Sequence, residues 1–129
     1  MNASEAVTEG IRIRVQSRYL ASESDPKREH YFFAYTVRIS NEGTLPAQLI
    51  SRHWVIRDSH GARDDVRGPG VVGKQPHLEP GEQFEYTSAC PLRTPLGQMQ
   101  GTYLMQRDDG AEFEARIAPF SLAAPEVSG

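Results

Sequence analysis

The chain has 129 residues, enough for one domain and too few for a second hydrophobic core. Its 14 Lys and Arg residues against 17 Asp and Glu residues give a net charge of -3, which argues against a general nucleic-acid binder, because phosphate affinity depends on clustered excess positive charge. Apolar residues make up 38% of the chain, and no stretch approaches the roughly 18 apolar residues that a membrane helix needs. The sequence therefore predicts a globular domain without a membrane span.

The chain ends and the single cysteine favour an ordinary cytoplasmic domain. Residues 1–10 lack the basic start and apolar run of a secretory signal. Cys90 is the only cysteine, which excludes an internal disulfide and every CxxC motif, and we expect a small thiol that is either packed or on the surface. Residues 123–129 are small and polar and predict a frayed tail. We expect a single domain over residues 3–127, with an ordered core at about residues 10–122 and flexible termini.

Alternation of apolar and polar residues with a period of two is the dominant pattern, and it predicts β-strands. In chain order, the alternating segments are residues 11–16, 31–39, 49–57, 84–86, 103–105 and 113–117. The second segment is apolar on both faces because Phe32 and Ala34 lie on the face that would otherwise be polar, and this predicts a central strand. The third segment carries Trp54, the only tryptophan.

Turn residues separate these segments and support strands rather than helices. Asp109-Gly110 joins two alternating segments directly and predicts a tight hairpin. Residues 79–82, with Pro in the second position and Gly in the third, predict a type II turn. We therefore predict an all-β fold, an antiparallel β-sandwich of about 7–8 strands, with a small barrel as the alternative. An aromatic second strand with Trp54 in the third favours an immunoglobulin-like or fibronectin-type sandwich. The absence of a disulfide favours the fibronectin type III-like form.

Motifs for catalysis are absent from the sequence. No serine lies in a GxSxG pattern, and His30, His53, His60 and His77 form no HExxH motif, so we expect surface or half-buried histidines. The pairs Asp64-Asp65 and Asp108-Asp109 predict solvated turn residues, and either pair alone would hold Mg²⁺ weakly. We expect no enzyme, no catalytic residue, no metal ligand and no cofactor.

Residues 68–73 match the string GxGxxG, which is associated with dinucleotide pyrophosphates. Pro76 and Pro80 follow too soon for a helix to start there, which excludes a Rossmann motif. A glycine-rich loop can still direct its backbone N–H groups at an anion, and Arg63 flanks it. The alternative is that the glycines permit a bulge or crossover while Val71-Val72 anchor the loop in the core. The candidate anion-binding residues are Arg67, Gly68, Gly70, Gly73 and Lys74.

Longer stretches of the sequence resemble the ApaG family. The resemblance is carried by residues 41–43, 53–61, 70–82 (GVVGKQPHLEPGE), 94–105, and Phe84, Tyr86 and Ser88, and it spans about residues 10–122. It implies a fibronectin type III-like sandwich and no catalytic residues. It also implies a link to cobalt tolerance and magnesium efflux beside the CorA transport system, as for bacterial members, and a protein-interaction role, as for related domains in F-box proteins and a DNA-polymerase-delta-interacting protein. The glycine motif of the family has been proposed to bind pyrophosphate.

Three functions follow as hypotheses. The first is a non-enzymatic cytoplasmic binding domain that acts through a partner protein of unknown identity and is tied to divalent-cation homeostasis. The second is a small-ligand binder that holds pyrophosphate or a nucleotide at the glycine loop. The third, an enzyme of diphosphate hydrolysis, lacks a paired acid–base constellation in the sequence.

Overall fold

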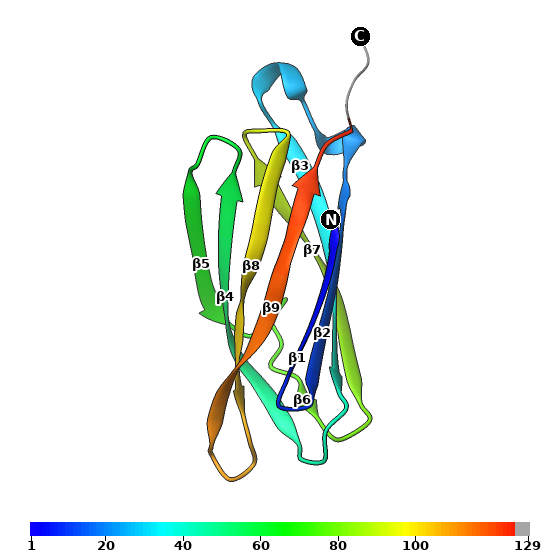
Figure 1. Ribbon diagram of the computed structural model, residues 1–129, viewed down its shortest axis with the longest axis vertical. Helices are drawn as coiled ribbons and strands as arrows, with labels where there is room; N and C mark the ends of the chain where they lie inside the picture. Colours follow the sequence, from blue (N-terminus) through cyan, green and yellow to red (C-terminus); the bar gives the residue numbers. More distant parts are fainter. Residues whose placement is uncertain (126–129) are drawn as a thin grey trace.

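The computed structural model describes residues 1–125 and is built almost wholly of antiparallel β-strands (Figure 1). The nine strands are β1 (Ala3–Thr8), β2 (Ile11–Tyr19), β3 (Tyr31–Asn41), β4 (Ala47–Asp58), β5 (Arg63–Pro69), β6 (His77–Leu78), β7 (Gln83–Leu92), β8 (Leu96–Gln106) and β9 (Glu112–Ala123). Two 3-10 turns, η1 (Ala21–Glu23) and η2 (Pro26–Arg28), lie between β2 and β3. Across residues 1–125 no helix is long and apolar enough to cross a membrane.

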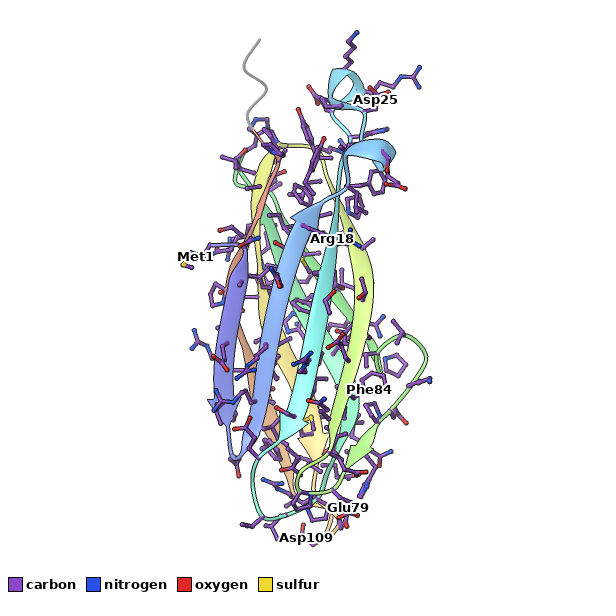
Figure 2. All side chains as sticks on the ribbon, turned by 90° about the vertical axis from the view of Figure 1, so that its right-hand side faces the viewer. Met1, Arg18, Asp25, Glu79, Phe84 and Asp109 are labelled. Carbon is purple, nitrogen blue, oxygen red and sulfur yellow. The ribbon has the colours of Figure 1, made fainter. Side chains whose placement is uncertain are left out.

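The strands form two sheets packed face to face, so the predicted β-sandwich is confirmed. One sheet has the order β1-β2-β3-β7, and the other has the order β5-β4-β8-β9 with β6 paired to β4. Figure 2 shows the first sheet face-on, with β3 between β2 and β7, as its two apolar faces predicted. The Asp109-Gly110 hairpin joins β8 to β9, and Glu82 N donates to Glu79 O at 2.9 Å in the predicted turn.

Three strands are additional to the six alternating segments, which makes nine strands in residues 1–125 where about 7–8 were predicted. β1 lies in a segment that we expected to be flexible, and its inward residues Ser4, Ala6 and Thr8 are too small or polar to give an apolar pattern. β5 is mostly charged and exposed, and β6 has only two residues. At the other end, β9 reaches into the predicted tail as far as Ala123, and residues 126–129 lie outside the described residues.

Trp54 occupies the centre of the core between the sheets. Its indole packs edge-on against Tyr103 and Phe120, with ring centroids 6.2 and 6.0 Å away, and lies 5.2 Å from the ring of Tyr35. The hydroxyl of Tyr103 is hydrogen-bonded to that of Tyr86, which satisfies two polar atoms inside the core. The inward positions of the alternating segments thus form one continuous core, as the period of two requires.

The two long edges of the sandwich differ. At one edge, β1 and β2 are tied to β9: Ser4 Oγ donates to Ala118 O and Ser17 Oγ donates to Ser121 O, both at 2.7 Å, and Ser121 N donates to Met1 O. We call this the closed edge. At the opposite edge, β5 and β7 each end their sheet and do not pair with each other. This open edge positions the candidate site.

Candidate binding site

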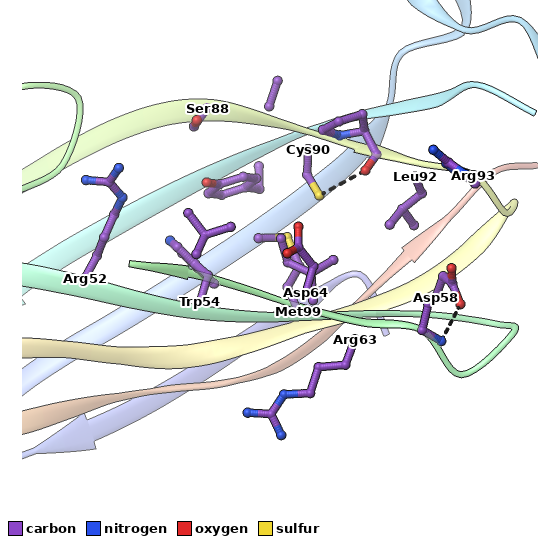
Figure 3. A pocket seen from close by; sticks show the side chains of 16 residues that line it. Arg52, Trp54, Asp58, Arg63, Asp64, Ser88, Cys90, Leu92, Arg93 and Met99 are labelled. Atoms are coloured by element: carbon purple, nitrogen blue, oxygen red, sulfur yellow. Dashed lines mark hydrogen bonds between the residues drawn. The ribbon is translucent and has the colours of Figure 1, made fainter. Parts of the chain in front are cut away.

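A groove of about 530 Å³ runs along the open edge between β5 and β7 (Figure 3). We call it the open-edge groove, and its principal lining residues are Tyr35, Arg52, Trp54, Asp64, Cys90 and Met99. Arg52 lies at one end of the groove, and Asp58 and Arg93 lie at the other. Its volume falls within the range of roughly 300–1,000 Å³ that is usual for binding pockets.

A β-bulge in β4 determines which side chains enter the groove. The pairing of β4 with β8 shifts register between Leu49 and Ser51. Before the bulge, the odd-numbered Leu49 faces the core; after it, the even-numbered Arg52, Trp54 and Ile56 face inward. A strand without a bulge would turn Arg52 to the outer face, because side chains alternate strictly along a regular strand.

The floor of the groove is apolar and densely packed. Trp54, Met99 and Cys90 are almost fully buried, and the indole Nε1 of Trp54 has no hydrogen-bond partner in residues 1–125. Burial raises the pKa of the Cys90 thiol to about 11, and the nearby charge of Asp64 acts in the same direction. The thiol is therefore protonated at neutral pH, and a buried protonated thiol is a poor nucleophile. Of the two places expected for Cys90, packed or on the surface, the structure has the packed one.

Arg52 is the cation that the sequence analysis missed. Its Nη1 donates to Pro69 O at 3.0 Å and to Gly70 O at 2.9 Å, which fixes the guanidinium at the end of β5. Gly68 lies directly against it, because a Cβ at Gly68 would come within 2.9 Å of Nη2 of Arg52. In residues 1–125, Arg52 forms no salt bridge with any carboxylate. The sequence carries no sign of the bulge that brings this side chain inside.

The glycine loop closes as a tight turn. Val71 N donates to Lys74 O at 2.8 Å, and Lys74 N donates to Val71 O at 2.9 Å. The two residues between them, Val72 and Gly73, have φ values of 44° and 78°, as a type I′ turn requires. Val71 is buried in the core, as the structural alternative for this loop expected. Val72 is 54% exposed, so the expected anchoring of the loop by both valines is wrong for Val72.

The predicted anion-binding residues are only partly brought together. Gly68 and Gly70 lie beside Arg52, whereas Arg67 pairs in register with His53 and therefore lies on the opposite, outer face of the sheet. Lys74 is exposed at the end of the turn that contains Gly73.

Other charged residues form pairs on the surface. Hydrogen bonds from Arg63, at 2.7 Å, and from His53, at 2.8 Å, hold the pKa of Asp65 well below its usual range. His77 is hydrogen-bonded to Asp108 at 2.8 Å.

Asp64-Asp65 lie in β5, so their predicted place in a turn is wrong. Among the described residues, no group of three or more His, Cys, Asp or Glu side chains is placed to hold a metal ion.

Comparison with known proteins identifies the family. A family model described as "ApaG domain" matches residues 21–107. The chain belongs to the ApaG family. Protein ApaG of Anaeromyxobacter dehalogenans strain 2CP-1 is 59% identical over 122 residues, which cover 95% of this chain and 96% of the relative. Protein ApaG of Methylobacterium radiotolerans is 58% identical over 123 residues, which cover 95% of each chain.

A solved ApaG-like structure has the same fold. The crystal structure of the putative ApaA protein from Bordetella pertussis superposes with a TM-score of 0.87 at 54% sequence identity, over 91% of this chain and 95% of the other. The two-sheet sandwich expected from the resemblance to ApaG is therefore confirmed.

Proposed function

We propose that this ApaG domain is a non-enzymatic binding domain that acts through contacts with a partner protein at its open edge. The observation that carries the proposal is the open-edge groove, where two strand edges that are unpaired in the described part of the chain flank an apolar floor. The guanidinium of Arg52 at one end of this groove has no carboxylate partner within residues 1–125. Unpaired strand edges and concave apolar surfaces are common docking sites for other chains. The resemblance to ApaG proteins is our reason for proposing a cytoplasmic role tied to cobalt tolerance and magnesium efflux.

Affinity capture with the full chain tests this proposal. Val66 is half-buried on the β5 wall of the groove, and Val66→Arg would fill the groove with a charged side chain. Gln16→Arg adds the same charge on the exposed outer face of β2 and serves as the matched control. We expect wild type and Gln16→Arg to recover the same partner at similar yield, and Val66→Arg to lose it while remaining folded. Repeated failure to recover a specific partner, or equal recovery by Val66→Arg, would contradict the proposal.

A second candidate function is the binding of pyrophosphate or a nucleotide at Arg67, Gly68, Gly70, Gly73 and Lys74. The observation that favours it is the guanidinium of Arg52 beside Gly68 and Gly70. Against it, the N–H groups of Gly70, Val71 and Lys74 already donate to backbone carbonyls. Those of Val72 and Gly73, at the end of the turn, form no hydrogen bond within residues 1–125.

An amide NMR titration with pyrophosphate, with and without Mg²⁺, tests the second candidate. Saturable shifts centred on the glycine loop, weakened by Lys74→Ala at an unchanged melting temperature, would support it. The absence of shifts at millimolar pyrophosphate would rule it out.

A further inference from the structure

The free edge of β7 exposes a defined set of backbone groups. Leu20 N donates to Phe32 O at 2.8 Å, so Phe32 turns its polar groups toward β2, and Asn41 N donates to Glu82 O, so Asn41 turns toward β7. Because successive residues of a strand point their N–H and C=O to opposite sides, odd residues of β3 bond to even residues of β7. The residues whose N–H and C=O face the free edge are therefore Gln83, Glu85, Thr87, Ala89 and Pro91, with no N–H on proline.

The free edge of β5 is less suited to strand pairing. The same reasoning, starting from Asp58 N donating to Ala62 O, places Arg63, Asp65, Arg67 and Pro69 on that edge. Three of these four carry charges, and Asp65 is held by two neighbours. Charged side chains and proline on an edge strand oppose the pairing of another chain. On β7, by contrast, Glu85 and Pro91 stand on either side of Thr87 and Ala89, which are small and uncharged.

Arg52 has unused hydrogen-bonding capacity at the start of the groove. Both of its hydrogen bonds within residues 1–125 come from Nη1, which leaves Nε and Nη2 without partners there. A carboxylate accepts two parallel hydrogen bonds from a guanidinium, and this pairing is stronger than one between neutral groups. The carbonyls of Pro69 and Gly70 hold the guanidinium in place, so that little side-chain entropy is lost when an anion binds.

The length of the groove matches an extended segment. Its β4 lining runs from Arg52 to Asp58, and at about 3.3 Å per residue this spans roughly 20 Å, or about six extended residues. The even residues Ser88, Cys90 and Leu92 point into the groove from β7. A strand added to β7 would direct every second side chain into the same space, first toward Arg52 and then over the apolar floor.

We propose that the open-edge groove binds an extended segment of a partner protein, which adds as a strand to β7 and places an Asp or Glu side chain on Arg52, with apolar side chains two and four residues further along. This rests on the proposed function and specifies the binding mode and the chemistry of the partner. The acidic residue selects the Arg52 end of the groove, because the cation at the opposite end, Arg93, lies at the same end as the carboxylate of Asp58.

Selection from a random heptapeptide library displayed on phage, with the full chain as bait, tests this inference. We expect enriched peptides with an acidic residue followed or preceded by apolar residues at intervals of two. In calorimetry with a synthetic selected peptide, replacing its acidic residue by Gln should lower affinity about tenfold or more, as should Arg52→Gln in the protein. Lys27→Gln, which removes an exposed cation on η2, should leave affinity unchanged.

N-methylation of the peptide separates strand addition from side-chain binding alone. Only every second N–H of the bound peptide faces β7. Methylation of the nitrogens in that set should abolish binding, and methylation of the nitrogens in the alternate set should be tolerated. Binding that is indifferent to N-methylation, to the peptide's acidic residue or to Arg52 would overturn the inference, as would a selection without enrichment or a dimer of this chain paired through β7. If affinity capture nevertheless recovers a partner with wild type and not with Val66→Arg, the inference about strand addition fails and the proposed function remains supported.

Discussion

At the scale of single residues, two positions of the glycine loop, Gly70 and Gly73, favour glycine for different physical reasons. Gly70 has a φ of 60°, and a Cβ there would come within 2.3 Å of Lys74 O. Gly73 has a φ of 78°, but a Cβ there would meet no atom within 4 Å. Gly73→Ala therefore carries the cost of the left-handed backbone alone, about 1–2 kcal/mol, whereas Gly70→Ala must also displace a backbone carbonyl.

We expect Gly70→Ala to lower the free energy of unfolding clearly more than Gly73→Ala, in urea titrations of both variants beside wild type. The difference arises because the Lys74 carbonyl is held by Val71 N and has little freedom to move. Equal losses of unfolding free energy in the two variants would show that the Lys74 carbonyl moves away from the added Cβ at residue 70 without loss of stability.

At the scale of elements, an ion pair ties β6 to the turn between β8 and β9. The hydrogen bond that His77 donates to Asp108, helped by the charges of Glu79 and Glu82, raises the pKa of His77 above its ordinary 6.5. A raised folded-state pKa adds stability that is fully present below pH 6.5 and is lost as the pH rises through the folded-state value. Both side chains are substantially exposed, so solvent screening keeps the effect small.

Asp108→Asn should remove this pH dependence. We expect the melting temperature of wild type to exceed that of Asp108→Asn by more at pH 6 than at pH 8.5, since the protonated histidine has its anionic partner only in wild type. His77→Gln provides the control, because it should show the same loss of pH dependence. A difference that is constant across this range would mean that the pair makes no pH-dependent contribution.

At the scale of the whole molecule, the sequence predicted the two packed sheets more completely than it predicted the strands and contacts at the edges of the sandwich. The period of two at Ile11, Ile13 and Val15 and the hairpin at Asp109-Gly110 reflect local physics, and both are found where they were expected. The inward turn of Arg52 depends on a bulge in β4, and β1 is held at the closed edge through Ser4 and other polar contacts with β9. Such features depend on pairing between distant segments, which a single-sequence pattern does not contain.

The contrast between the edges predicts where the sandwich opens first. Hydrogen bonds cross between the sheets at the closed edge, whereas at the open edge β5 and β7 do not pair and the groove lies between them. Cys90 is buried under the open edge, and with its pKa raised to about 11 its thiol reacts slowly with iodoacetamide in the closed sandwich. Local opening needs less free energy than global unfolding, so its rate should dominate labelling.

We expect Cys90 to be labelled in native buffer faster than global unfolding allows, with a weak dependence on low urea concentrations. The control is Ala115→Cys in a Cys90→Ser chain, since Ala115 is fully buried in β9, next to the closed edge, and its thiol should be labelled only through global unfolding. A selected peptide that adds to β7 should slow the labelling of Cys90 and leave that of the control unchanged. Equal labelling rates for the two thiols would mean that the two edges open together. Opening at the open edge would then need as much free energy as global unfolding.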